Sequence, residues 1–277
     1  MMKRIFAAAL AGVMAVCVLA GCQPKNEDVN AGTGSAASGT NGGDWDGKTL
    51  VVGVDDKFAP MGFRDENNNV VGFDIDLAKK AAEHMGCEVE IKPINWDNKI
   101  MELNNGNVDV IWNGFTITEE RQKAVLFTKP YLANDQVIVV KKDNSSINKI
   151  DDLEGKKVVL QKDSSAEEAF AKQAVQSKVK SLNKVADNAM GMLEVKNGSS
   201  DALIVDSVVA KYYISQNPDQ YRIVGESLAP EEYGIGVKKG NTALLEKLQS
   251  ALDTMWEDGS AKEISEKWFG EDLLLRD

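Results

Sequence analysis

Polar and aromatic side chains gather directly after the predicted strands of this chain. In parallel α/β sheets, ligands bind at the carboxyl ends of the strands and at the starts of the helices that follow. Each of these residues alone could be a helix cap, a core aromatic or a surface charge, so only their shared placement predicts a ligand site. They are Asp55, Asp56, Phe58, Trp96, Asn113, Gly114, Phe115, Thr116, Arg121, Ser164, Ser165 and Asp206.

Catalytic motifs give no comparable signal. Gly-x-Ser-x-Gly and His-Glu-x-x-His do not occur in the sequence. His84 is the only histidine, and its place beside Glu83 on a predicted helix favours a solvated face over a ligand role. A zinc site or a histidine-based triad is therefore not expected. We expect no enzyme activity, no metal and no cofactor.

Strands and helices alternate from Trp45 onward, which favours an α/β fold with parallel sheets. Thr49–Val54 is an apolar run typical of a buried strand. Asp74 is predicted to cap a helix that ends at Met85, with Gly86 as its stop. The other predicted strands are 89–93, 108–112, 136–140, 158–161, one near 179, 202–205, 223–224 and 233–237, and the other predicted helices are 98–104, 164–175, 187–196, 208–215, 242–257 and 260–269.

The N-terminus predicts a secretory signal. Lys3 and Arg4 precede an apolar run over 5–20, which is shorter than the roughly 20 apolar residues of a relaxed membrane span. The sequence Leu-Ala-Gly-Cys at 19–22 resembles the lipobox of bacterial lipoproteins, in which the cysteine becomes the acylated N-terminus. We therefore expect a lipoprotein signal peptide over 1–21 and a lipid on Cys22, anchoring the protein on the extracytoplasmic face of the cell membrane. An ordinary signal peptide with an incidental cysteine is the alternative.

The composition of residues 22–44 predicts a disordered tether. Gly, Ser, Thr, Ala and Asn dominate there, and little apolar surface is available to bury. The formal net charge of −11 at pH 7 argues against nucleic acid, whose binding relies on phosphate neutralisation, and against electrostatic binding to anionic lipid. Membrane attachment is therefore expected through the lipid alone. Beyond Cys22 only Cys87 remains, so no intrachain disulfide is expected after processing.

A weak internal repeat favours two similar lobes. Segment 102–109 is echoed by 194–201, and in both a helix ends in Asn-Gly before an Asp begins an apolar strand. Chance is the alternative, because a helix, a glycine and a strand in succession are a generic pattern.

Four motifs carry a family resemblance: Val-Gly-Phe-Asp-Ile-Asp-Leu-Ala at 71–78, Gly-x-Thr-Ile-Thr-x-x-Arg at 114–121, Phe-Thr-x-Pro-Tyr at 127–131 and Lys-Trp-Phe-Gly at 267–270. The chain resembles the extracellular solute-binding proteins, family 3, which serve ABC importers of polar amino acids. The resemblance covers the chain after the tether.

The resemblance implies an α/β fold of the two-lobed, type II periplasmic-binding-protein kind, with the ligand cleft between the lobes. Lobe 1 would comprise 45–134 plus 231–277, and lobe 2 would comprise 135–230. Two hinge crossovers would lie near 133–138 and 226–233, and binding would close the lobes. The implied partners are an amino acid and an ABC transporter permease, and the protein would be a monomer.

The resemblance also implies roles for the candidate residues. The guanidinium fork of Arg121 would bind the ligand's α-carboxylate. Thr116 would add its hydroxyl and backbone N–H, and Ser164 and Ser165 would complete that side from a helix N-terminus. An exposed ion pair of Arg121 with the glutamates at 119–120 is the alternative.

On the other side of the ligand, Asp206 resembles the partner of the α-ammonium, and Phe58 and Trp96 resemble aromatic walls. Asp55 aligns with a side-chain-binding aspartate. A buried carboxylate needs a donor, so a ligand with a distal N–H group is expected: cystine, arginine, lysine or glutamine, with a lean toward cystine. Asn113 and Gly114 complete the expected ligand-binding set.

Some positions depart from the family or stay open. Trp112 stands where better-known members carry small residues. Asp56 is expected to face solvent, and Glu231 and Glu232 could reach the cleft or merely cap the return crossover. Two rival functions also remain: a secreted enzyme on the same fold, such as a cyclohexadienyl dehydratase, and the sensor domain of a receptor.

Overall fold

The computed structural model describes residues 45 and 47–276. These residues belong to one compact unit, Asn41–Asp277. The predicted signal peptide (1–21), the lipid site Cys22 and the predicted tether (22–44) lie outside the described residues. Within 45 and 47–276, no helix is both long enough and apolar enough to cross a membrane.

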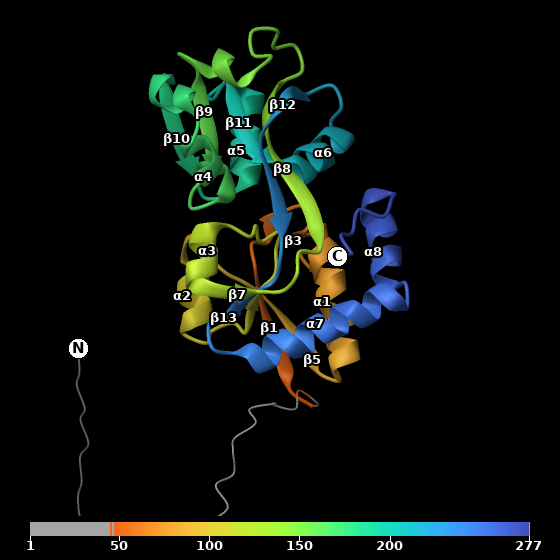
Figure 1. The fold of residues 1–277 in the computed structure, drawn as a ribbon. Coiled ribbons are helices and arrows are strands. Elements are labelled where there is room, and N and C mark those ends of the chain that lie inside the picture. Colours follow the sequence, from red (N-terminus) through yellow and green to blue (C-terminus); the bar gives the residue numbers. More distant parts are fainter. Residues whose placement is uncertain (1–44, 46, 277) are drawn as a thin grey trace, which may run out of the picture. The chain divides into compact units, whose positions relative to one another are not determined.

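A five-stranded sheet organises what we call the first lobe (Figure 1). Its strand order is β5 (Glu88–Pro93), β1 (Thr49–Val54), β6 (Val110–Ile111), β13 (Gly236–Lys238) and β7 (Val125–Phe127). β1 pairs in parallel with β5 and β6, whereas β13 pairs antiparallel with β6 and β7. The chain therefore leaves this sheet after β7 and returns to it through β13.

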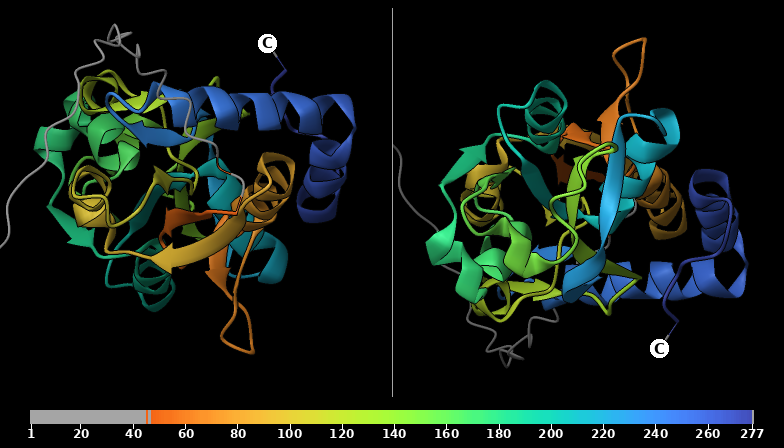
Figure 2. Two further views of the ribbon diagram at one scale, coloured as in Figure 1. Left: turned by 90° about the horizontal axis from the view of Figure 1, so that it is seen from below. Right: turned by 90° about the horizontal axis from the view of Figure 1, so that it is seen from above.

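Helices cover both faces of the first sheet because β1 alternates its apolar side chains between them. Leu50, Val52 and Val54 pack into the main core, while Val51 packs against a smaller cluster around Leu103. On the main-core face, α1 (Phe73–Met85), α7 (Thr242–Glu257) and α8 (Ser260–Phe269) pack together (Figure 2). The smaller cluster lies beneath η1 (Trp96–Asn98) and α2 (Lys99–Asn104), and α3 (Glu119–Ala124) leads into β7.

A small antiparallel sheet of three short strands follows β1. The strands are β2 (Lys57–Phe58), β3 (Gly62–Arg64) and β4 (Val70–Val71). The loop between β3 and β4 projects from the body in both views of Figure 2.

A second five-stranded sheet organises the second lobe. Its order is β10 (Ser181–Val185), β9 (Lys157–Gln161), β11 (Ala202–Asp206), β8 (Leu132–Lys141) and β12 (Tyr221–Tyr233). β9 pairs in parallel with β10 and β11, and β8 pairs antiparallel with β11 and β12. The helical segments of this lobe are η2 (Ile150–Leu153), α4 (Ser165–Ala171), η3 (Ala174–Lys178), α5 (Asn188–Asn197) and α6 (Ser207–Gln216).

β8 and β12 are the two strands that connect the lobes (Figure 1). They pair from Leu132 opposite Tyr233 to Lys141 opposite Tyr221, with register shifts between Ile223 and Ala229. The predicted crossovers fall within these two strands, and the exact lobe boundaries stay a prediction.

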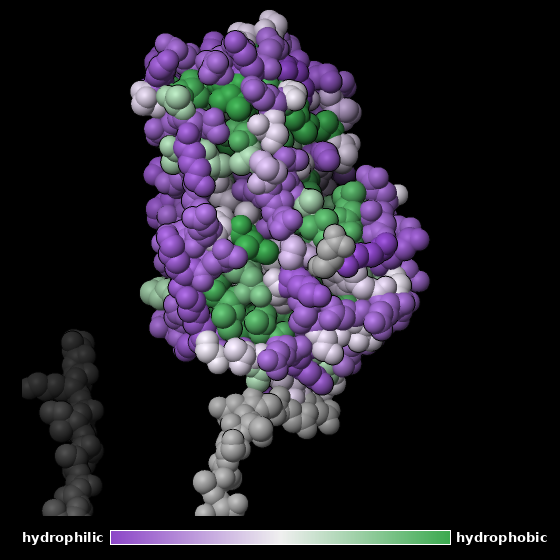
Figure 3. All heavy atoms as spheres, viewed as in Figure 1, coloured by the Kyte–Doolittle hydropathy of each residue, from purple (hydrophilic) through white to green (hydrophobic). Residues whose placement is uncertain are grey.

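Hydrophilic residues cover most of the face shown in Figure 3, in keeping with an acidic chain.

The two-lobed α/β prediction is confirmed, but several local predictions are wrong. Asp74 does not cap α1, because the N-cap is Gly72 and the Asp74 side chain is fully buried. Gly72 has a φ of 148°, and a Cβ there would lie 2.2 Å from the Met61 carbonyl oxygen. The helix predicted over 164–175 ends at Ala171, and the strand predicted over 233–237 is split between β12 and β13.

Candidate ligand-binding site

A small cavity lies where the two lobes meet, and its walls come from both. The first lobe contributes Phe58, Trp96, Gly114 and Arg121, and the second contributes the carboxyl ends of β9 and β11 with the residues that follow them. Its volume is about 10 Å³, close to that of one water molecule. An amino acid can enter only if the lobes move apart. The lining residues are Phe58, Trp96, Gly114, Arg121, Gln161, Ser164, Ser165, Ala166, Asn188, Val205 and Asp206.

Arg121 reaches this cavity from the first turn of α3. Thr118 caps α3 by accepting a hydrogen bond from the Arg121 N–H at 3.2 Å. The guanidinium is buried, lies 4.7 Å from the centroid of the Phe115 ring, and donates through Nη1 to the Thr116 carbonyl at 3.0 Å. Burial lowers the pKa of Arg121 from its ordinary value. The alternative of an exposed pair with the glutamates at 119–120 is wrong for this structure, since the guanidinium is buried.

Glu168 is the carboxylate closest to Arg121 among the described ion pairs, with its Oε1 3.9 Å from Arg121 Nε. That separation is at the limit of an ion pair and leaves most donors of the guanidinium available. Five N–H groups in a fixed plane suit a bidentate carboxylate. Arg121 is therefore equipped to bind a second, better-placed carboxylate.

Asp206 faces the cavity from the opposite lobe, at the end of β11. It is buried, and Gln136 Nε2 donates a hydrogen bond to its Oδ1. Burial, and secondly the charge of Glu231, raise the pKa of Asp206 to about 8, against the opposing effects of the Gln136 hydrogen bond and the Arg121 charge. An ammonium group would supply the positive charge that this carboxyl needs to ionise.

Gly114 lets the first-lobe wall approach the aromatic ring of Phe58. Its φ is 52°, in the left-handed region, and a Cβ there would lie 2.7 Å from Phe58 Cε1. The Gly114 N–H donates to Asp74 Oδ2 at 2.6 Å, and Tyr131 donates through its hydroxyl to Asp74 Oδ1 at 2.9 Å. Asp74 thus anchors the cavity wall to α1, and burial raises the pKa of Asp74 to about 7.

Of the residues expected to bind the ligand, Asp55, Asn113 and Thr116 do not line the small cavity. Asp55 is buried behind it and accepts a hydrogen bond from Gln161 Nε2 across the lobes at 2.8 Å. Burial raises the pKa of Asp55 to about 6. Asn113 accepts a hydrogen bond from the Asp55 N–H through its side-chain oxygen. Thr116 lies at the contact between the lobes, where its hydroxyl is 3.1 Å from Ser165 Oγ.

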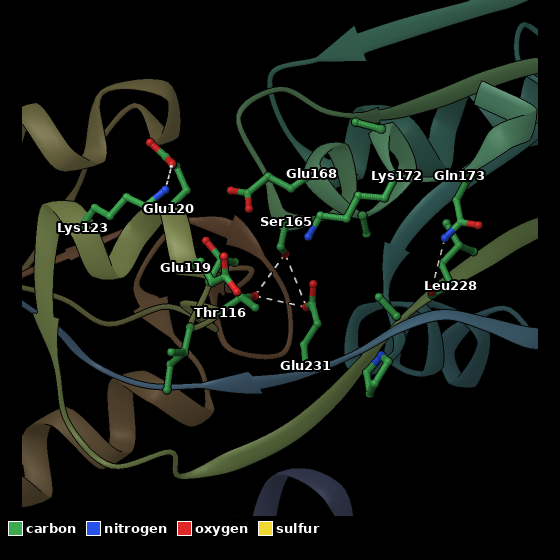
Figure 4. Close-up of a pocket in the computed structure, with 16 residues that line it drawn as sticks. Thr116, Glu119, Glu120, Lys123, Ser165, Glu168, Lys172, Gln173, Leu228 and Glu231 are labelled. Atoms are coloured by element: carbon green, nitrogen blue, oxygen red, sulfur yellow. Dashed lines mark hydrogen bonds and ion pairs between the residues drawn. The ribbon is translucent and has the colours of Figure 1, made fainter. Parts of the chain in front are cut away.

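A larger pocket of about 680 Å³ adjoins this contact, between α3, α4 and the β12 segment near Glu231 (Figure 4). Thr116 and Ser165 line it, and the Glu231 carboxylate points between their hydroxyls. Glu232, the neighbour of Glu231, is exposed. The sequence left open whether Glu231 and Glu232 reach the cleft, and in the structure it is Glu231 that does.

Direct contacts join the lobes around the cavity. Lys99 Nζ donates to the Asp163 carbonyl at 2.8 Å, and Lys162 Nζ lies 2.5 Å from Asp97 Oδ2. Lys57 Nζ also pairs with Asp187 Oδ2 at 3.0 Å. These contacts cross from one lobe to the other, which describes a closed cleft.

Sequence reasoning missed Gln161, Asn188 and Gln136, and it left open whether Glu231 reaches the cleft. Gln161 ends a predicted strand, so the same placement rule would have found it. Asn188 follows β10, whose position was predicted only loosely. Gln136 and Glu231 lie inside strands, where no rule based on strand ends could indicate a site.

In the part of the chain that the structure describes, no group of three acidic, histidine or cysteine residues could hold a metal ion.

Comparison with known proteins agrees with this architecture. The L-cystine-binding protein TcyJ of Escherichia coli (strain K12) is 32% identical over 266 residues, covering 96% of this chain and 96% of that protein. The ABC transporter glutamine-binding protein GlnH of Bacillus subtilis (strain 168) is 33% identical over 276 residues, covering 98% of this chain and 99% of that protein. A solved structure described as an ancestral arginine-binding protein bound to glutamine is 47% identical, with a TM-score of 0.76, and covers 80% of this chain and 98% of its own. Residues 50–271 match the family of bacterial extracellular solute-binding proteins, family 3, and the chain belongs to that family.

Proposed function

We propose that this protein is the substrate-binding protein of an ABC importer and captures a polar amino acid between its lobes. The observation that carries the proposal is a buried guanidinium, Arg121, and a buried carboxylate, Asp206, which face one cavity from different lobes. An α-amino acid carries the two complementary charges on groups bonded to the same carbon atom. Binding it would neutralise both buried groups and tie the lobes together.

The α-carboxylate would bind Arg121 bidentately, with hydroxyl donors from Thr116 and Ser165. The Ser164 hydroxyl instead donates to the Gln161 carbonyl at 2.6 Å and accepts from the Glu167 N–H as the cap of α4. The α-ammonium would bind Asp206. A charge-assisted hydrogen bond contributes about 1.5–3 kcal/mol, roughly twice a neutral one, so these contacts would dominate the affinity.

The side chain of the ligand would extend between Phe58 and Trp96 toward Asp55. There Asp55 is hydrogen-bonded to Gln161, whose Oε1 accepts from Asn188 Nδ2 at 3.1 Å. This end of the site offers a carboxylate and two amides, which match a distal N–H donor. Cystine, arginine, lysine and glutamine carry one, and the relatives of this chain include a cystine-binding and a glutamine-binding protein.

We further propose that the protein is a lipoprotein, anchored through Cys22 on the extracytoplasmic face of the cell membrane and monomeric, and that it delivers its ligand to a permease. The support is the signal-like N-terminus and the Leu-Ala-Gly-Cys sequence at 19–22. The lipid would hold the protein close to its transporter, while residues 22–44 would let the lobes reach it.

A calorimetric screen of the common amino acids and cystine tests the proposal. We expect at least one member with a distal N–H donor to bind reversibly with one site per chain. At 100 times its dissociation constant, such a ligand should add roughly 2.7 kcal/mol to the free energy of unfolding. Tight binding of glutamate or leucine without binding of the donor-bearing set would contradict the ligand class. Turnover of prephenate or arogenate would favour the dehydratase instead.

A further inference from the structure

The return crossover β12 places a carboxylate oxygen at the contact between the lobes. Glu231 Oε2 accepts hydrogen bonds from Thr116 Oγ1 at 3.1 Å and from Gln136 Nε2 at 3.0 Å. It also accepts from Asn134 Nδ2 at 3.2 Å and lies 3.4 Å from Ser165 Oγ. One oxygen thus joins the first lobe, the second lobe and both connecting strands, as Figure 4 shows for Thr116 and Ser165.

The donors around Glu231 Oε2 are buried, although Glu231 itself is half-buried. The exposed fractions of Thr116, Asn134 and Gln136 are 2%, 4% and 0%. Each of these groups needs a hydrogen-bond partner, since an unpaired buried donor is costly. The Glu231 carboxylate is therefore an integral part of the closed contact.

The two hydroxyls that contact Glu231 are those that the proposed function gives to the ligand's α-carboxylate. A hydroxyl has one proton to donate, so Thr116 cannot serve Glu231 and a ligand carboxylate at the same time. Two carboxylates at the same donors also repel each other. The ligand and Glu231 must compete for Thr116 and Ser165.

Glu231 is poorly placed to serve as a second partner for the α-ammonium. It lines the larger pocket, whereas Arg121 and Asp206 line the small cavity. Gln136 Nε2 lies between the two carboxylates and donates to both. The position of Glu231 is therefore that of a substitute carboxylate.

We propose that Glu231 is an internal latch, which bridges Thr116 and Ser165 in the place of a ligand carboxylate and holds the lobes together until a ligand displaces it. That the displacing group is the carboxylate of an amino acid rests on the proposed function. That Glu231 holds the two lobes together does not. Because a ligand must first break the latch, the latch lowers the apparent affinity.

The distance between the lobes tests the latch without any ligand. We would replace the three native cysteines of the full-length chain by serine and attach spin labels at Met101→Cys and Met190→Cys, which are 52% and 48% exposed on α2 and α5. Pulsed electron resonance should show that Glu231→Gln reduces the short-distance population at least twofold. Glu231→Asp keeps the charge but shortens the reach, and should have a similar effect. Glu232→Gln removes the same charge from an exposed neighbour and should change nothing. Identical distributions for the Glu231 variants and Glu232→Gln would overturn the latch.

The sign of the affinity change tests the competition. Glu231→Gln should bind the amino acid roughly tenfold more tightly than the native chain, because a neutral amide holds the donors less strongly than a carboxylate does. Glu232→Gln should bind within twofold of the native chain. Unchanged or weaker binding by Glu231→Gln would overturn the competition. If the native chain binds no amino acid, the proposed function fails, and the distance measurement still decides the latch.

Discussion

Arg121 and Asp206 are ionisable groups at positions where burial opposes charge. Arg121 has one hydrogen bond to a backbone carbonyl and a carboxylate at 3.9 Å, and Asp206 depends on a hydrogen bond from Gln136. Burying charge without a close partner is expensive unless a ligand or a proton compensates. The raised pKa of Asp206 is the sign of this cost. At the level of single residues, this pair of groups suits the proposed ligand, which carries both charges.

Ligand binding should therefore release a proton below pH 8. The pKa of Asp206 is about 8 because of burial and the Glu231 charge, whereas an ammonium partner needs the carboxylate. Affinity should rise with pH between 6 and 8, by up to about tenfold per unit well below the pKa. Calorimetry in buffers of different ionisation enthalpy measures the proton directly. An affinity that falls with pH over this range would contradict the assignment of Asp206.

Asp206 also makes the free energy of unfolding depend on pH. The folded-state pKa of Asp206 lies above its ordinary value of 3.8. Its contribution to the stability of the unliganded protein is therefore fully present below pH 3.8 and is lost as the pH rises through about 8.

Asp55→Asn should separate cationic ligands from glutamine. A cationic side chain would lose its charge pair with Asp55, whereas glutamine would lose only part of a neutral hydrogen bond. We expect a loss above about tenfold for arginine or lysine and below about threefold for glutamine. Titration of both ligands against Asp55→Asn measures this difference. Asp56→Asn is the matched control, because Asp56 pairs with Arg64 outside the cavity. Equal losses for all ligands would argue that Asp55 does not recognise the charge on the ligand's side chain.

At the element scale, α1 fixes the first-lobe wall of the site through Asp74. Its two oxygens accept from the Gly114 N–H and the Tyr131 hydroxyl, both buried. Asp74→Ala should lower the free energy of unfolding by about 3 kcal/mol or more, because each abandoned donor costs about 1–3 kcal/mol. Urea denaturation measures this, with Glu83→Ala on the exposed side of α1 as the control. A change below about 1 kcal/mol for Asp74→Ala would show that the anchor is unimportant.

Elements with a strong local pattern could be predicted from the sequence. α7 and α8 were predicted with their observed bounds, since apolar spacing and terminal caps agree there. β2, β3 and β4 were missed because two or three residues carry no period. The choice between Glu231 and Glu232 depends on the register of β12 against β8, which is a tertiary property. Cross-lobe partners such as Gln161 and Asp55 are separated by 106 residues, and no local pattern links them.

For the whole molecule, Cys22→Ser should release the protein from membranes. The reason is that anchoring is expected through lipid on this cysteine alone. Fractionation after a carbonate wash measures it, with Cys87→Ser as the control that keeps the anchor. Retention of Cys22→Ser in the membrane fraction would contradict the proposed attachment.

The proposed function requires that one amino acid is held by charges from both lobes. Removing one partner of a buried charge pair costs about 3–5 kcal/mol, which corresponds to a loss of roughly 150- to 5,000-fold in affinity. Exposed pairs contribute less than about 1 kcal/mol, so Lys123→Ala, an exposed change on the same helix as Arg121, serves as the control. Calorimetric titration of Arg121→Ala and Asp206→Ala with the identified amino acid is the most direct test. We predict losses above about 100-fold for both variants, and losses below about tenfold in both, with the fold intact, would contradict the account.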